Sequence, residues 1–218
     1  TTYQIDIDKI EIAGEGALLK LIEKRKKNLQ KQGYFDQDKK KPIPYLPTRI
    51  GVITSPTGSV VYDIINRIND RFPMPLDIWP VSVQGTDAVL SITQAINGFN
   101  EMTVDKPDLI IIARGGGSTE DLMAFNDENL AINVFESKIP IISAIGHETD
   151  TTIIDLVSDL RASTPTAAAE IAVPVRDNIE IQIKNLHFQL ENRIKSKFSI
   201  IKDNFEYLNK LLKAPNFI

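Results

Sequence analysis

Short apolar runs alternate with amphipathic segments along residues 49–145. Four runs predict strands, and three segments with apolar residues at helical spacing predict helices between them. The strands are IGVIT from Ile50, LDIWPVSV, LIIIA at 109–113 and IPIISAI at 139–145; the helices run through Val60 to Ile68, Ile92 to Ile96, and Leu130 to Phe135. Almost purely apolar strands that alternate with helices are typical of a parallel sheet buried on both faces. We therefore predict a doubly wound, mostly parallel α/β domain with helices on both faces over residues 49–174.

The segments before this domain have different patterns. Residues 1–13 alternate apolar and polar positions, which predicts a strand, and a lone strand implies an earlier domain to which it belongs. Residues 14–48 contain a basic helix that ends at Gly33, followed by a Lys- and Pro-rich linker.

Residues 175–218 place apolar side chains at steps of three or four, from Ile179 to Leu212. This spacing predicts the start of a long helical region with one apolar stripe. The stripe requires a partner helix or another chain, unless the helix folds back on its own domain.

The composition narrows the classes of protein. The chain has no cysteine, which excludes disulfides, thiolate zinc sites and cysteine nucleophiles and agrees with a reducing, cytoplasmic location. No apolar run approaches the length of a membrane helix, so we expect no membrane association.

The charge distribution is uneven, although the net charge is only −4. Residues 1–48 carry ten Lys and Arg against seven Asp and Glu, and residues 175–218 carry eight against five. Residues 49–174 carry only seven Lys and Arg against seventeen Asp and Glu. A phosphate site in this domain must therefore be built from local groups.

The loop TSPTGS at 54–59 follows the first predicted strand of the domain. Thr57 is expected to cap the next helix, and Thr57, Gly58 and Ser59 are candidates for binding phosphate through helix N-terminal amides. The spacing lacks the lysine of a Walker loop, and a purely structural turn remains the alternative. Asp63, one turn further on, is either a solvated helix residue or points to the cleft.

The second loop follows LIIIA and begins at Arg114. Arg114 offers a bidentate donor for phosphate oxygens, and the next three glycines allow backbone amides to approach an anion closely. The glycines could instead only make a tight turn. The candidate phosphate-binding residues here are Gly115, Gly116, Gly117 and Ser118.

The third loop carries His147, Glu148 and Asp150 directly after IPIISAIG. A histidine beside carboxylates suits general acid or base chemistry. HETDT fails the HExxH pattern of zinc proteases, and we predict no metal ligands. Further along, Arg161 is a possible supporting residue, and Thr164 with Pro165 predicts a helix start.

These motifs, in this order, resemble the large subunit of exodeoxyribonuclease VII. The resemblance rests on RIGVITSPTGS, PVSVQG, LIIIARGGGSTEDLMAFND and IPIISAIGHETDTTIIDLVSDLRASTPTAAAEIAVP. It implies an exonuclease that hydrolyses single-stranded DNA from both ends to products with 5′-phosphates. It places the catalytic residues at Asp63, Arg114, His147 and Asp150.

The resemblance also implies partners. Residues 1–13 would be the remnant of an OB-fold domain that binds single-stranded DNA, and the region from Val175 would bind several copies of a small subunit. No cofactor is firmly implied; a divalent cation such as Mg²⁺ is compatible with the family but not required. The alternative is a non-catalytic α/β module that binds a nucleotide or a DNA end, against which His147 and Asp150 argue, since phosphate binding needs only donors.

Overall fold

The structure is a computed structural model and describes residues 15–115, 121–146 and 151–212. The chain divides into two compact units, Thr1–Pro174 and Val175–Ile218. Within the described residues, no helix is both long enough and apolar enough to cross a bilayer.

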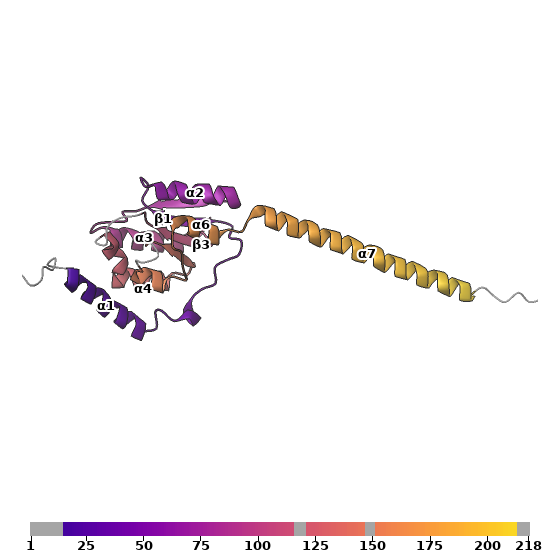
Figure 1. Cartoon of the computed structure of the whole chain (residues 1–218), viewed down its shortest axis with the longest axis horizontal. Helices are drawn as coiled ribbons and strands as arrows, with labels where there is room; N and C mark the ends of the chain where they lie inside the picture. The colour runs from indigo at the N-terminus through magenta and orange to yellow at the C-terminus, as the bar shows by residue number, and fades with distance from the viewer. Residues whose placement is uncertain (1–14, 116–120, 147–150, 213–218) are drawn as a thin grey trace, which may run out of the picture. The chain divides into compact units, whose positions relative to one another are not determined.

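The described part of the first unit contains a five-stranded sheet in the order β2-β1-β3-β4-β5, and every pairing is parallel. Figure 1 shows the central strands β1 and β3 among the helices of this unit. The strands are β1 Ile50–Thr54, β2 Leu76–Pro80, β3 Leu109–Ala113, β4 Ile141–Ala144 and β5 Leu160–Arg161. The predicted α/β fold with a parallel sheet is confirmed.

Helices cover both faces of the sheet. Val52 and Ile111 pack in a cluster with α2 and α6, whereas Ile53 and Ile112 pack in a second cluster with α3, α4 and α5. Neighbouring strand residues point to opposite faces, so each central strand is buried on both sides. The helices are α2 Ser59–Arg71, α3 Ala88–Glu101, α4 Glu128–Glu136, α5 Ile153–Val157 and α6 Pro165–Ala172, with the 3-10 helix η2 at Asp121–Asn126.

The parallel register brings the carboxyl ends of three strands to one edge. Ile53 of β1 lies beside Ile112 of β3, and Ile112 lies beside Ser143 of β4. The loops that leave β1, β3 and β4 therefore start at the same edge, as we predicted from the alternation of strands and helices.

Two details differ from the sequence prediction. The strand expected to run through Val83 ends at Pro80. The Val81 amide still donates to the Thr54 carbonyl, but the Ser82 hydroxyl donates to the carbonyl of Gln84, two residues later, as in a turn. The short elements α5 and β5 were not predicted, because they are too brief to show a period.

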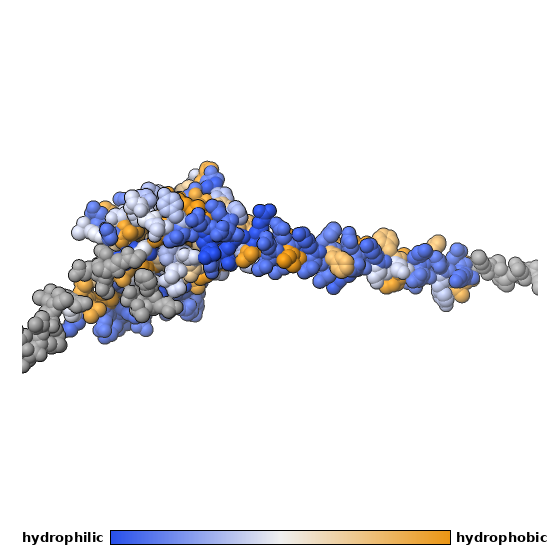
Figure 2. Space-filling model, turned by 45° about the horizontal axis from the view of Figure 1, so that its top comes forward, coloured by the Kyte–Doolittle hydropathy of each residue, from blue (hydrophilic) through white to orange (hydrophobic). Residues whose placement is uncertain are grey.

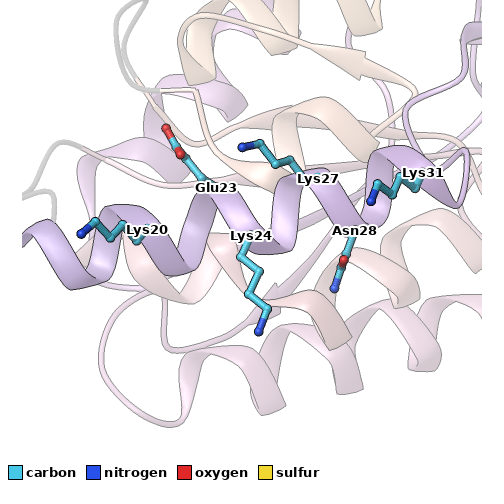
Figure 3. A pocket seen from close by; sticks show the side chains of 6 residues that line it. All are labelled: Lys20, Glu23, Lys24, Lys27, Asn28 and Lys31. Carbon is cyan, nitrogen blue, oxygen red and sulfur yellow. The ribbon is translucent and has the colours of Figure 1, made fainter.

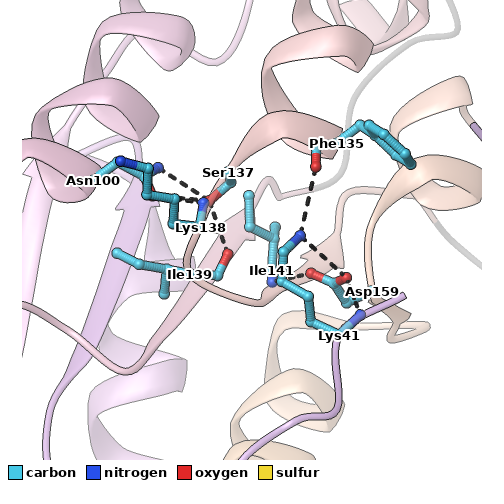
Figure 4. A network of polar contacts seen from close by, with 8 residues as sticks. All are labelled: Lys41, Asn100, Phe135, Ser137, Lys138, Ile139, Ile141 and Asp159. Carbon is cyan, nitrogen blue, oxygen red and sulfur yellow. Dashed lines mark hydrogen bonds and ion pairs between the residues drawn. The ribbon is translucent and has the colours of Figure 1, made fainter. Parts of the chain in front are cut away.

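The segment before the domain contains α1, Glu15–Lys31, and the 3-10 helix η1, Gln37–Lys39. As expected, α1 ends near Gly33, which has a φ of 76°. The chain then contacts the sheet: the Lys41 amide donates to Asp159 at 2.7 Å, and the other oxygen of Asp159 accepts from the Ile141 amide at 2.8 Å (Figure 4). Residues 1–13, with their predicted strand, lie outside the described residues.

Hydrogen bonds also join the amino ends of β1 and β3. The hydroxyl and the amide of Thr48 both donate to the same carboxylate oxygen of Asp108, each at 2.6 Å. Both bonds lower the pKa of Asp108 because they stabilise its charged form, and the bond from the hydroxyl has the larger effect.

The second unit consists of α7, Arg176–Leu212, within the described residues. It confirms the predicted long C-terminal helix, and none of its side chains is buried. Figure 2 shows separate apolar patches among polar side chains along its length. Leu186, Leu190, Ile194 and Phe198 of α7 are each at least 47% exposed.

Two glycines make room for an aromatic pair under the sheet. The rings of Trp79 and Phe99 meet edge to face at 5.2 Å, where a Cβ on Gly51 would lie 2.9 Å from the Phe99 ring. A Cβ on Gly98 of α3 would overlap the Trp79 indole. These positions require glycine because of the close approach of the rings.

We therefore expect Gly98→Ala to lower the free energy of unfolding by about 1–3 kcal/mol, as overpacking usually does, despite the gain of about 1 kcal/mol in helix propensity. Urea denaturation measures the change. Gly16→Ala is the control, because nothing lies within 4 Å of its added Cβ. Equal effects of the two substitutions would contradict this account.

Candidate active site

The candidate site lies where the strand order changes direction. From β1 the chain crosses through α2 to β2 on one side, and from β3 it crosses through α4 to β4 on the other. In open α/β sheets this arrangement leaves a crevice outside the carboxyl ends of the two adjacent strands, where ligands bind.

Two pockets open at this edge. The first has a volume of about 370 Å³ and lies between the loops that follow β1, β2 and β3. The second, about 240 Å³, lies between the loop after β3, the end of β4 and the start of α6. Both are lined by Ser59, Val60, Arg114 and Gly115.

Arg114 occupies the boundary between the two pockets. It follows β3 directly, its amide donates to the Ala144 carbonyl at 3.1 Å, and the residue is only 5% exposed. A guanidinium remains charged at physiological pH and presents several donors in one plane, which match the oxygens of a phosphate. The buried position excludes much of the water that would otherwise weaken this attraction.

Asp63 and Arg114 both line the second pocket. Asp63 belongs to α2, is exposed, and lines this pocket together with Arg114 and Gly146. Its carboxylate can accept a proton or hold a water or an imidazole, roles that complement the donors of Arg114.

Two helices begin at the second pocket. Ser59 starts α2, and Thr164 and Pro165 start α6. The amides of a first helical turn carry partial positive charge and favour an anion. The predicted cap of α6 is confirmed, since the Thr164 hydroxyl accepts from the Ala167 amide at 3.0 Å.

The cap predicted for α2 is wrong. Gly58, not Thr57, is the N-cap and makes no side-chain cap, while the Thr57 hydroxyl lies 3.2 Å from that of Ser55. Because Gly58 has no side chain that could accept from them, the first amides of α2 are candidates for binding a ligand in the pockets. Thr57, Gly58 and Ser59 all line the first pocket.

Close packing limits the loop after β3. A Cβ on Gly115 would lie 3.2 Å from the Val60 side chain, so a larger residue there would require a small shift of Val60 or of the loop. Gly116, Gly117 and Ser118 lie outside the described residues, as do His147, Glu148 and Asp150. Gly146, which precedes His147 in sequence, is buried and lines the second pocket.

A buried carboxylate anchors the chain just after residue 150. Asp155 accepts from the Thr152 amide at 2.8 Å and the Thr152 hydroxyl at 2.9 Å, and its other oxygen accepts from Ser143 of β4 at 2.5 Å. Its side chain is fully buried. Arg161, which we expected in a supporting role, lies 3.8 Å from Asp155 and so contacts this anchor.

A buried amide side chain, that of Asn126, links two further segments near the site. The Asn126 side chain, at the end of η2, donates to the Leu122 carbonyl at 3.1 Å and accepts from the Ile153 amide at 3.0 Å. It thus ties the segment that follows the Arg114 loop to the segment that follows residue 150.

Sequence reasoning missed several residues of the site. The Asp155 anchor could have been recognised from Thr152-x-x-Asp155, which has the spacing of a capping box, and the structure contains that box. Ser82 and Gln84 line the first pocket; they belong to PVSVQG, one of the motifs of the family resemblance, but their residue types alone do not indicate a ligand site. Asn126 belongs to the motif that begins with LIIIA, but its bond to the Ile153 amide has no local signal, because Ile153 is 27 residues away in sequence.

The described residues contain no cluster of three or more His, Cys, Asp or Glu side chains that could hold a metal ion. Arg114 and the two helix starts instead supply positive potential. Fold and pockets together define an α/β protein whose strand-end edge suits an anionic group such as a phosphate.

The chain belongs to the exonuclease VII large-subunit family, whose model, described as "Exonuclease VII, large subunit", matches residues 34–217. The resemblance seen in the motifs is thereby confirmed. The exodeoxyribonuclease 7 large subunit of Mesorhizobium japonicum is 54% identical over 99% of this chain and 42% of its own length. That of Bartonella henselae is 52% identical over 98% of the chain and 46% of its own length. The chain thus spans less than half the length of these relatives.

Removing the Asp155 carboxylate should destabilise the region beside the site. We expect Asp155→Ala to lower the free energy of unfolding by about 3–5 kcal/mol, because it leaves the Thr152 and Ser143 donors without their buried acceptor and removes the charge that faces Arg161. Asp155→Asn, which keeps one carbonyl oxygen, should cost less. Urea denaturation measures the free energy of unfolding of both variants and of a control, Asp87→Asn, on the surface. If Asp155→Ala loses no more free energy of unfolding than this control, Asp155 does not anchor the region.

Proposed function

We propose that this chain forms the nuclease centre of an exodeoxyribonuclease of the exonuclease VII type, which hydrolyses single-stranded DNA from its 5′ and 3′ ends. The observation that carries the proposal is the second pocket, where Arg114, Asp63 and the starts of α2 and α6 line one cavity beside Gly146. Family membership supports the same reaction, since the relatives are named exodeoxyribonucleases.

The reaction follows from the chemistry of these groups. Arg114 and the helix amides hold the scissile phosphate and stabilise the negative charge that develops when water attacks phosphorus. The bond from phosphorus to the 3′ oxygen breaks, the new product end keeps a 5′-phosphate, and the 3′ oxygen takes a proton.

Proton transfer is assigned to the loop that carries His147. The imidazole, oriented by Asp150 or Asp63, either takes the proton of the attacking water or gives one to the leaving 3′ oxygen. Glu148 and Arg161 would support this loop. A divalent cation is not required by this scheme, and cleavage assays with and without a chelator test its participation.

The first pocket suits the neighbouring nucleotide. Its lining includes the polar residues Ser55, Thr57, Ser82 and Gln84 together with Arg114. Hydroxyl and amide groups can bond a sugar, a base edge or the adjacent phosphate, so this pocket would position the strand while the second holds the scissile phosphate.

A non-catalytic module that binds a DNA end is the second candidate. The described groups alone, namely Arg114 and the helix starts, would suffice to bind a phosphate. His147 and Asp150 distinguish the two functions, because binding without cleavage needs no acid or base.

We expect Arg114→Ala and His147→Ala each to slow cleavage by about 10²-fold or more, through loss of electrostatic and acid–base catalysis respectively. The assay uses a full-length large subunit that carries these residues, assembled with its small subunit, and labelled single-stranded DNA. DNA affinity should change little in either variant.

Matched controls are Arg67→Ala and His187→Ala. Arg67 forms an exposed ion pair with Glu170, and the His187 side chain is 72% exposed on α7. Both should cleave at nearly the parental rate. A folded His147→Ala variant, as judged by its melting curve, with near-parental activity would refute the mechanism; an unsubstituted assembly that binds DNA ends without releasing products would favour the binding module.

We further propose that α7 begins the region that binds several copies of the small subunit. Its support is the 37-residue helix with no buried side chain and with apolar residues at steps of three or four. Apolar side chains repeated in this way on a long helix are typical of helix–helix association.

Leu190→Glu combined with Ile194→Glu should abolish co-purification of the small subunit with this chain, because the charges would be buried in the contact. Gln189→Glu combined with Ser196→Glu adds the same charge at polar positions of the same helix and should leave the complex intact. Unchanged co-purification of the first variant would contradict the proposed contact.

A further inference from the structure

Four lysines form a line along α1. Lys20, Lys24, Lys27 and Lys31, here called the lysine stripe, are spaced by four, three and four residues and therefore share one face of the helix. All four are exposed. With Glu23 and Asn28 they line a shallow depression of about 340 Å³, and Figure 3 shows their side chains spaced along the helix.

The opposite face of α1 is attached to the domain. Leu29 is fully buried, Ile22 packs against the same core, and the Arg25 guanidinium donates to the Asn126 carbonyl at 2.7 Å. Arg25 also lies 3.4 Å from Asp127. At about 100° per residue, Leu29 lies opposite the lysine stripe, so these contacts hold the stripe toward solvent.

No folding contact explains the lysine stripe. Within the described residues, none of the four ammonium groups forms an ion pair or a hydrogen bond. Like charges three or four positions apart instead repel and destabilise the helix by about 0.2–0.5 kcal/mol per pair. With a polyanion bound along them, the same lysines would stabilise the helix instead of destabilising it.

The charge of α1 contrasts with that of the domain that it covers. The helix holds six Lys and Arg against two Glu, whereas residues 49–174 carry seventeen acids against seven bases. An anionic polymer is repelled by most of the domain, so the lysine stripe is a local exception with the complementary charge.

We propose that the lysine stripe binds the backbone phosphates of single-stranded DNA and holds the strand next to the active site. The identity of the polyanion rests on the proposed function. The stripe spans about 16 Å of helix, enough for more than one phosphate of a flexible strand. Its attachment supports the role: Arg25 bonds to Asn126, the residue that joins the segments after the two candidate catalytic loops.

The test replaces all four residues by glutamine, which retains helix propensity and removes the charge. Affinity of the chain for fluorescently labelled oligothymidine is measured by anisotropy at several salt concentrations. We expect at least a roughly tenfold weaker affinity at low salt, and a slope of log affinity against log salt that is shallower by about 0.7 for each phosphate that the stripe neutralises. Circular dichroism verifies that the variant remains folded.

The control replaces Lys184, Lys195, Lys197 and Lys202 of α7, four exposed lysines, by glutamine and changes the net charge equally. If both variants lose the same affinity, or neither loses any, the lysine stripe is not a DNA-binding surface. Cleavage is measured separately. If the stripe variant binds DNA more weakly but the unsubstituted assembly does not cleave DNA, the lysine stripe is supported and the proposed nuclease function is refuted. If the unsubstituted assembly cleaves DNA and the stripe variant binds DNA as tightly as the parental chain, the lysine stripe is refuted and the nuclease function is supported.

Discussion

The site depends on the parallel pairing of β1 with β3. These strands lie side by side in the middle of the sheet, although α2, β2 and α3 separate them in sequence. Because their crossovers leave on opposite sides, the described residues leave two pockets at their carboxyl ends. Arg114 lies at that point, directly after β3 and only 5% exposed, and this position keeps its charge largely away from water.

A few buried polar side chains hold the surroundings of this edge in place. Asp155 bonds to β4 and to the start of α5, and Asn126 bonds η2 to the same helix. Buried polar groups stabilise a structure only when their partners are all present. Each of these side chains therefore favours one arrangement of the segments that flank residues 116–120 and 147–150, and Asn126 extends this arrangement to α1 through its carbonyl.

Electrostatics reconciles the acidic domain with the polyanionic substrate that the proposed function requires. The positive groups are few but concentrated: one buried guanidinium, the amides at the start of two helices and, on α1, a line of ammonium groups. Phosphates are attracted where these groups lie and repelled elsewhere, so the distribution of charge selects a path more effectively than a uniformly basic surface would. The long helix α7 carries most of the large apolar side chains that are exposed among the described residues, so the proposed assembly surface and the proposed active site lie in different segments of the chain.

The sequence by itself determined the order of the main strands and helices, because long apolar runs and helical spacing are local signals. It also made Arg114 a candidate from its type and its place directly after a strand, it made Asp63 a candidate through the family resemblance, and it identified the family. Only the tertiary structure showed that these two side chains line one pocket, that Gly58 rather than Thr57 caps α2, and that Asp155, Asn126, Ser82 and Gln84 surround the site. The physical reason is that a polar side chain has no periodicity of its own: its role depends on donors and acceptors that the parallel sheet brings together from distant parts of the chain.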